Sequence, residues 1–147
     1  MGIKTYNPKN VTITLVSGLG AHIVKGYDDG QFINIEYESD AYDHIAGADG
    51  EEMRVKKNDR RASCTITLLQ SSDTNNYLSN LENLDRVSDS GVAAFLLKDA
   101  SSGEIVATDS VWIKKRPAYS RDKSKVAMAW VLSMKSPDFN YAGAAES

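Results

Sequence analysis

The stretch from Ala62 to Leu84 changes its hydrophobic period part-way, and this change constrains the fold more than any other feature of the chain. In its first part Cys64, Ile66 and Leu68 alternate with polar residues, which is the period-2 pattern of a strand with one buried face. After residue 71 the apolar residues recur at three- and four-residue spacing. That spacing predicts one amphipathic helix, over about residues 72–84, that covers an open end or face of a β structure.

The rest of the chain is typical of strands and turns. Strand patterns run over residues 11–16, 32–38, 51–57, 92–98, 104–115 and 125–135. With the strand that begins at Ala62 they predict an α+β fold, mostly antiparallel, as a β-sandwich or partial barrel of about seven strands and one helix. Residues 39–50 are expected to form a loop. Loops of about a dozen residues are uncommon in a compact domain, so this one is expected to have a function.

Three strand patterns make finer predictions about burial. The run over residues 92–98 is continuously apolar, as expected for a strand buried on both faces. In the strand over residues 51–57, Met53 and Val55 are predicted to point inward. In the strand over residues 104–115, the partial alternation puts four apolar residues on one face and Trp112 on the opposite side. The four are Ile105, Ala107, Val111 and Ile113.

Length and composition favour one globular domain over residues 1–147, long enough to bury a core without covalent staples. The net charge of −3 gives no general reason to expect nucleic-acid affinity. The single cysteine, Cys64, excludes an internal disulfide and is expected to be a buried, inert thiol. No apolar run approaches the roughly 20 residues that span a bilayer. The first residues lack a signal-peptide pattern, so we expect a protein made and used without Sec export.

No catalytic, cofactor or metal site is predicted. His22 and His44 stand at unrelated positions, without the spacing of a zinc site. There is no phosphate loop or dinucleotide fingerprint, and nothing marks a nucleophile. We therefore expect a protein that is not an enzyme and holds no cofactor.

Acidic and basic residues are segregated along the chain. Seven acidic residues lie between positions 31 and 53 with no lysine or arginine among them, and basic clusters follow. One interpretation is solvated hairpin tips; the other is complementary pairing between copies of the chain, which sets register and orientation more than affinity. The candidate inter-subunit residues are Asp40, Asp43, Asp49, Glu51, Glu52, Arg54, Lys56, Lys57, Arg60, Arg61, Lys114, Lys115, Arg116 and Arg121.

The order of short motifs resembles a known family. After an early alternating strand come Tyr27-Asp-Asp-Gly30, Phe32-Ile33, the loop Asp43-His-Ile-Ala-Gly-Ala-Asp-Gly-Glu51, a Thr-Ile-Thr-Leu strand, and Gln70-Ser-Ser-Asp-Thr-Asn-Asn76 before a helix. This order resembles the tail tube proteins of bacteriophages with contractile tails. The resemblance covers roughly residues 10 to 135 and rests on small and polar residues, not on catalytic signatures.

The resemblance implies a β-sandwich-like subunit that forms a six-membered ring. Rings stack into a tube, and the inner strands of all subunits join into one barrel around a channel that conducts DNA during infection. A sheath surrounds such a tube, and baseplate and tail terminator proteins close its ends. The implied location is the virion tail, assembled in the cytoplasm of the host bacterium, with no membrane partner.

A channel that passes DNA should not grip phosphates, because a basic lining would bind the polyanion. We therefore predict that the polar side of the strand over residues 32–38 lines the channel, with a second strand as a weaker candidate. The lumen-lining candidates are Asn34, Glu36, Glu38, Ser63, Thr65 and Thr67. The alternative is the wet outer face of an ordinary sheet. We also predict that the loop over residues 39–50 reaches onto an adjacent subunit.

Three other functions remain open. A monomeric ligand-binding β-sandwich, such as a carbohydrate module, needs an exposed aromatic platform, for which Trp112 and Tyr119 are the candidates. An enzyme whose site is assembled in three dimensions leaves no motif. The tube of a contractile bacteriocin-like injector has the same features as a phage tail tube.

Overall fold

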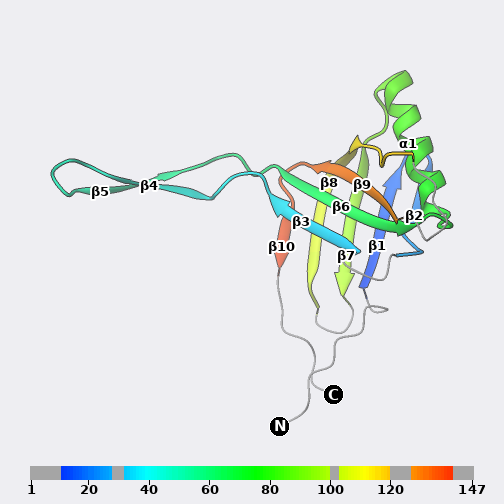
Figure 1. Cartoon of the computed structure of the whole chain (residues 1–147), viewed down its shortest axis with the longest axis horizontal. Coiled ribbons are helices and arrows are strands. Elements are labelled where there is room, and N and C mark those ends of the chain that lie inside the picture. Colours follow the sequence, from blue (N-terminus) through cyan, green and yellow to red (C-terminus); the bar gives the residue numbers. More distant parts are fainter. Residues whose placement is uncertain (1–10, 28–31, 100–102, 120–126, 141–147) are drawn as a thin grey trace, which may run out of the picture.

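The structure is a computed structural model that describes residues 11–27, 32–99, 103–119 and 127–140 (Figure 1). The strands are β1 (Val11–Ser17), β2 (Gly20–Ile23), β3 (Ile33–Tyr37), β4 (Tyr42–Ala46), β5 (Glu52–Lys56), β6 (Ala62–Leu69), β7 (Ala93–Asp99), β8 (Ile105–Lys115), β9 (Ala127–Met134) and β10 (Asp138–Asn140). The helix is α1 (Thr74–Ser88). The predicted α+β fold, mostly antiparallel with a single helix in the described residues, is confirmed.

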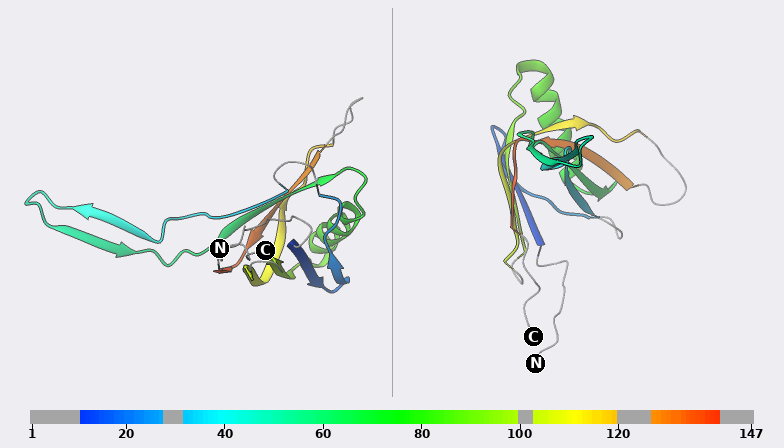
Figure 2. Two further views of the ribbon diagram at one scale, coloured as in Figure 1. Left: turned by 90° about the horizontal axis from the view of Figure 1, so that it is seen from below. Right: turned by 90° about the vertical axis from the view of Figure 1, so that its left-hand side faces the viewer.

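Eight strands form one antiparallel sheet in the order β2-β1-β7-β8-β9-β6-β3, with β10 added beside β8. The long β8 joins two halves, because its first part pairs with β7 and β10 and its last part pairs with β9. The sheet bends sharply, so that the two halves face each other across the core (Figure 2). The strand path ends on β2 and β3 and does not close into a barrel.

The segment after β2 crosses between the two ends of the sheet. The N–H of Val24 donates to the carbonyl of Ile13 in β1 at 2.9 Å. Two residues later, the carbonyl of Gly26 accepts from the N–H of Leu69 in β6 at 2.8 Å. Single backbone bonds of this kind bring the ends of the sheet together without a continuous ladder.

Alternation along the strands fills the core from both halves of the sheet and from the helix. The largest fully buried apolar side chains are those of Trp130, Phe95, Ile13, Leu15, Ile66, Leu68, Leu78, Leu81, Leu132 and Met134. Leu78 and Leu81 come from α1, so the helix covers the core as predicted. The indole N–H of Trp130 donates to Asn75 Oδ1 at 2.8 Å, which joins β9 to the same helix.

Helix α1 begins two residues later and ends four residues later than the predicted span of 72–84. Asp89 ends it in the left-handed conformation, with φ of 56°. The next turn is tight: the N–H of Gly91 donates to Asp85 Oδ1 at 3.2 Å, and a Cβ at this glycine would lie 2.3 Å from Asp85 Cβ. Only glycine fits this position without displacing the helix. In the described residues no helix has the length and apolar character needed to cross a bilayer.

Two of the burial predictions are wrong. In β7 the residues alternate between buried and exposed, and Leu96 lies on the outer side, so this strand is covered on one face only. In β8 the inner residue near the start is Val106, while Ile105 is exposed. A register shift between β7 and β8 explains this, because it adds one residue to β8 before Val111. Such a bulge exchanges the two faces of a strand.

Candidate assembly surfaces

The predicted lumen-lining residues lie together on one side of the sheet. In the register of β3 with β6, Asn34 lies opposite Thr65, and Glu36 lies opposite Ser63. Thr67 follows two residues after Thr65 and therefore points to the same side. The opposite side of β6 is buried in the core. We call this outer surface the polar face: Asn34, Glu36, Glu38, Ser63, Thr65 and Thr67.

Glu38 follows β3 and completes the polar face. Its carboxylate accepts a hydrogen bond from the hydroxyl of Ser63, and its Oε1 lies 3.9 Å from Lys114 Nζ at the end of β8. The neighbouring strand β9 adds small residues to this side, with Ala129 opposite Thr67 and Ser133 opposite Ser63. This side of β3, β6 and β9 therefore carries polar and small residues, and the charges on β3 and in the residue after it are acidic.

Strands β4 and β5 pair with each other and stand far out from the body (Figure 1). We call residues 41–57 the arm, since the N–H of Lys57 donates to the carbonyl of Ala41 at 2.9 Å and closes its base. The predicted loop over residues 39–50 is thus wrong in part, because it contains β4. The missed signal was the Asp49-Gly50 pair between two alternating segments, which favours a hairpin.

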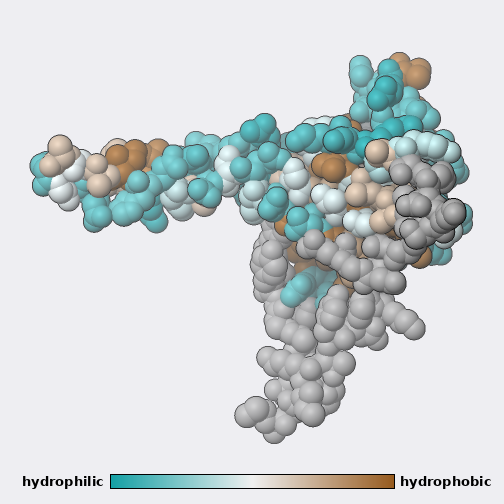
Figure 3. Space-filling model, viewed as in Figure 1, coloured by the Kyte–Doolittle hydropathy of each residue, from teal (hydrophilic) through white to brown (hydrophobic). Residues whose placement is uncertain are grey.

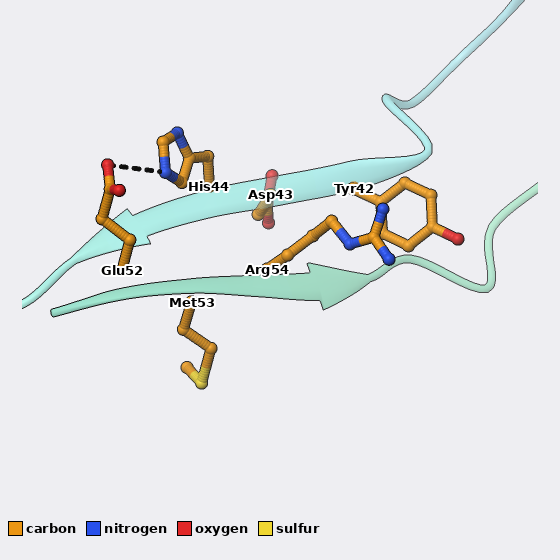
Figure 4. Close-up of a pocket in the computed structure, with 6 residues that line it drawn as sticks. All are labelled: Tyr42, Asp43, His44, Glu52, Met53 and Arg54. Atoms are coloured by element: carbon orange, nitrogen blue, oxygen red, sulfur yellow. Dashed lines mark ion pairs between the residues drawn. The ribbon is translucent and has the colours of Figure 1, made fainter.

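One side of the arm carries charges that pair within the hairpin (Figure 4). His44 Nε2 lies 3.2 Å from Glu52 Oε1, and the guanidinium of Arg54 lies 4.3 Å from the ring centre of Tyr42. These residues point to the same side, and Met53 points away from them. We call this the charged side of the arm; Lys56, opposite Tyr42 in the register, lies on it as well.

The other side of the arm is apolar. The register pairs Ile45 with Met53 and Asp43 with Val55, which places these four side chains together. The three apolar ones are between 39% and 57% exposed. The prediction that Met53 and Val55 point inward is therefore wrong, because the arm has no core to point into. We call this the apolar side of the arm; Asp43 is its one charged residue in β4 and β5, and it lies 3.5 Å from Lys57 Nζ.

Two arm acids lie in the tip and shape it. The N–H of Glu51 donates to Asp49 Oδ1 at 3.1 Å, and the N–H of Gly47 donates to the carbonyl of Glu51. Asp40 precedes the arm, and Lys56 lies in β5. All four charged side chains are exposed.

The root of the arm is tied to the end of the chain. The Tyr37 hydroxyl donates to the carbonyl of Pro137 at 2.7 Å. Arg60 Nη2 donates to the Tyr37 hydroxyl at 3.4 Å and lies 3.8 Å from Asp138 Oδ1. These contacts set the direction in which the arm leaves the body.

Arg61 makes two hydrogen bonds to the carboxylate of Asp59, at 2.9 and 2.8 Å. The side-chain hydrogen bonds from Arg61 hold the pKa of Asp59 well below its usual range, with a smaller contribution from Ser39. The pair is exposed, so it fixes the geometry of the root more than it stabilises the fold.

Arg116 has partners within its own chain. Its Nε donates to the buried carboxylate of Glu82, and its Nη2 donates to Asn83 Oδ1 at 2.9 Å and to the carbonyl of Ser79 at 3.1 Å. Glu82 also accepts from Arg86 Nε at 2.7 Å. Among the other basic candidates, Lys114 and Lys115 end β8, and Arg121 lies outside the described residues.

Cys64 and possible metal ligands are the remaining groups with chemical potential. Cys64 is fully buried, and burial raises the pKa of its thiol to about 12, which keeps it protonated and unreactive. The described residues contain no cluster of three or more acidic, histidine or cysteine side chains that could hold a metal ion.

Comparison with known proteins decides the family. The family model of the bacteriophage PhiTE tail tube protein matches residues 3–140. This chain belongs to that family. It is a structural subunit of a phage tail tube and a component of the virion tail.

Relatives of this tail tube subunit agree with the assignment. Structural protein ORF10 of Pseudomonas phage KPP10 is 29% identical over 144 residues, which cover 95% of this chain and 83% of that protein. The tail of an empty gene transfer agent particle, with C6 symmetry, contains a chain with a TM-score of 0.64 at 13% identity, covering 93% of this chain and all of that one. The sheath/tube terminator of an extracellular contractile injection system gives 0.54 at 10% identity, with 96% and 98% covered. At these identities the structural matches show a shared fold.

Proposed function

We propose that this tail tube subunit forms six-membered rings that stack into a hollow tube, and that DNA passes through the tube during infection. The polar face lines the channel. The observation that carries this proposal is the gathering of the six polar-face residues on one outer side of β3 and β6. The six side chains carry hydroxyls, an amide and acids and no cation, and the nearby ammonium group of Lys114 lies 3.9 Å from the carboxylate of Glu38; the face therefore has little to bind phosphates with, and DNA can slide past it.

Free strand edges support a ring. The large sheet ends on β2 and β3, and exposed edges of this kind pair readily with other chains. Joining the polar-face strands of neighbouring subunits into one barrel covers such edges. A ring needs two different complementary surfaces on each subunit, because its contacts are head-to-tail.

The partners follow from the same architecture. One structural neighbour is a tail with C6 symmetry and another is a sheath/tube terminator, which supports rings of six and a terminator at one end. We further propose that sheath and baseplate proteins bind the outside and the other end of the tube. Assembly takes place in the host cytoplasm. The arm and the basic residues near it reach an adjacent subunit, whereas Arg116 acts within its own chain.

Electron microscopy of the purified chain in negative stain, at low and high concentration beside its solution mass, tests this proposal. Rings or hollow tubes are the expected result. A monomer at every concentration, which also fails to polymerise on a baseplate, would favour the ligand-binding β-sandwich instead. In that case the half-exposed Trp112 becomes the first residue to test for carbohydrate binding.

An injector tube is the second candidate, because one structural neighbour belongs to a contractile injection system. The two candidates differ in cargo. Particles that contain this subunit and package DNA support the phage tail, and particles without DNA support the injector.

A further inference from the structure

The arm presents an apolar surface that no described part of its own chain covers. Ile45, Met53 and Val55 share one side of a two-stranded hairpin, and in the described structure no other element packs on it. An isolated hairpin is marginally stable in water, so this side gains most from a partner. The space-filling view shows a hydrophobic patch among mostly hydrophilic atoms on the arm (Figure 3).

A second apolar surface lies on the outer side of β1, β2 and β7. The register places Ile23 opposite Thr14 and Thr14 opposite Leu96, and Val16 lies two residues along from Thr14. Ile23, Val16 and Leu96 are between 44% and 50% exposed. We call these three residues with Thr14 the β1 patch. Their strands turn the other side to the core, so the patch is a stable platform.

The two surfaces match in charge. Asp43 is the one charged residue on the apolar side of β4 and β5; it lies 3.5 Å from Lys57 Nζ of its own chain, and its side chain is 49% exposed, which leaves it accessible to a second cation. Lys98 is the one charged residue on the outer side of β1, β2 and β7, one step along β7 from Leu96 on that side. An acid beside one apolar surface and a base beside the other set the orientation of a contact between them.

The two surfaces lie at opposite ends of the molecule, so one subunit cannot bring its own arm onto its own patch (Figure 1). The arm leaves from β3 at one edge of the sheet, and the patch includes β2 at the other edge. A contact between them is therefore intermolecular and heterologous, and such contacts build rings or filaments.

We propose that the apolar side of the arm docks on the β1 patch of a second copy of this chain. This inference rests on the proposed tube, and it names the surface that receives the arm. The charged side of the arm, where His44 pairs with Glu52, stays in water. The contact is thus made by apolar burial, and charge complementarity between Asp43 and Lys98 orients it.

Disulfide trapping tests the contact directly. Ile45→Cys and Leu96→Cys are made as separate chains, one of them labelled with nitrogen-15, and are mixed under mild oxidation. The native thiol of Cys64 is fully buried and does not compete. The matched control replaces Ile45→Cys by His44→Cys, which moves the thiol one residue to the charged side. We expect about tenfold more mixed disulfide from position 45 than from position 44, because docking raises the effective concentration of one thiol only.

Assembly of point variants gives a second readout. Ile45→Asp should abolish rings or tubes, and His44→Asp should leave them intact; both sites are exposed and away from the core, so neither substitution should prevent folding. If the wild-type chain assembles and position 45 gives no more mixed disulfide than position 44, the docking inference is wrong and the tube stands. If the wild-type chain stays monomeric and no mixed disulfide forms, both the tube and the docking are wrong.

Discussion

Glu82 is a buried carboxylate that two arginines from different elements neutralise. Arg86 lies one helical turn after it in α1, while Arg116 reaches it from just beyond the end of β8. Arg116 donates to Glu82, Asn83 and the carbonyl of Ser79, which all belong to α1. This side chain therefore connects the helix to the sheet. A buried charge that loses its partner costs free energy, because water cannot replace the lost hydrogen bonds.

Arg116→Ala should lower the free energy of unfolding by about 1–3 kcal/mol, measured by urea denaturation. Arg86→Ala is the control, because Arg86 is the more exposed partner and its loss should cost less than about 1 kcal/mol. An equal loss of unfolding free energy in the two variants would contradict the role of Arg116 as the main partner of Glu82. If Arg116→Ala leaves the free energy of unfolding unchanged but prevents assembly, Arg116 contacts a neighbouring subunit, as the sequence predicted.

His22 lies between the sheet and the helix. Its ring stacks on Tyr77 at 4.4 Å, and its Nε2 lies 2.9 Å from Thr74 Oγ1. Burial, with a further contribution from Lys25, lowers the pKa of His22, and Asp73 opposes this only in part. The unfolded chain therefore takes up the proton first as the pH falls. The stabilisation is present above the unfolded pKa of about 6.5 and is lost as the pH falls from there toward the folded pKa.

The free energy of unfolding should fall between about pH 7.5 and about pH 5.5, and it should fall less in His22→Gln. Urea denaturation at several pH values measures both slopes. The control is His44→Gln, because His44 is exposed on the arm. Parallel curves for His22→Gln and the wild-type chain would show that His22 does not carry the pH dependence.

The arm is an element that contributes nothing to the core. Residues 42–56 can be replaced by an Asn-Gly turn, because Ala41 and Lys57 already share a backbone hydrogen bond at 2.9 Å. The free energy of unfolding should change by less than about 1 kcal/mol, since no core contact is lost. Rings or tubes should be lost. A large drop in stability, measured by urea denaturation, would show that the arm also supports the body.

The strands that could be predicted are those whose alternation reflects a real core. In β6 the predicted residues Cys64, Ile66 and Leu68 are buried, because this strand turns one side to the core and the other side away from it. The arm could not be predicted for the opposite reason, since both of its sides are exposed and neither packs on a core. In β8 the bulge before Val111 changes the face part-way, and local alternation cannot reveal a bulge.

The polar face could also be predicted only in part from the sequence. Alternation placed Asn34 and Thr65 on the polar sides of two strands, and the register then showed that these sides are one surface. The segregation of acidic and basic residues along the chain did not reveal which charged residues form ion pairs. Arg116, for example, pairs with Glu82, which is 34 residues away in sequence. Pairing across such distances depends on the bend of the sheet, which no local pattern encodes.

At the scale of the whole molecule, the charge of the polar face is expected to control how DNA passes. Asn34→Lys/Glu36→Lys raises the formal net charge by three, one for the amide and two for the acid, from −3 to 0. Assembled tubes of this variant should retain DNA, and the retention should weaken steeply between about 50 mM and about 200 mM salt. Co-sedimentation of tubes with DNA measures it.

A matched control adds the same charge elsewhere. Asn76→Lys/Asn80→Lys/Ser90→Lys also adds three charges, at exposed positions in and just after α1. These tubes should retain much less DNA than those with a basic polar face. Equal retention by both variants would mean that the polar face does not line the channel.

The way the arm joins the sheet has a mechanical consequence. The arm leaves from β3 and returns into β6, and Tyr37 and Ala62 are paired at that junction. In Figure 1 the arm continues roughly along the line of these two strands. A pull on the arm therefore acts lengthwise on β6, which β9 holds through eight registered pairs. Lengthwise tension loads all eight together in shear, whereas a sideways pull would peel them apart in turn. In the proposed tube, the arm would carry tension from a neighbouring subunit into β6 and β9, and a column of such subunits would resist being drawn apart.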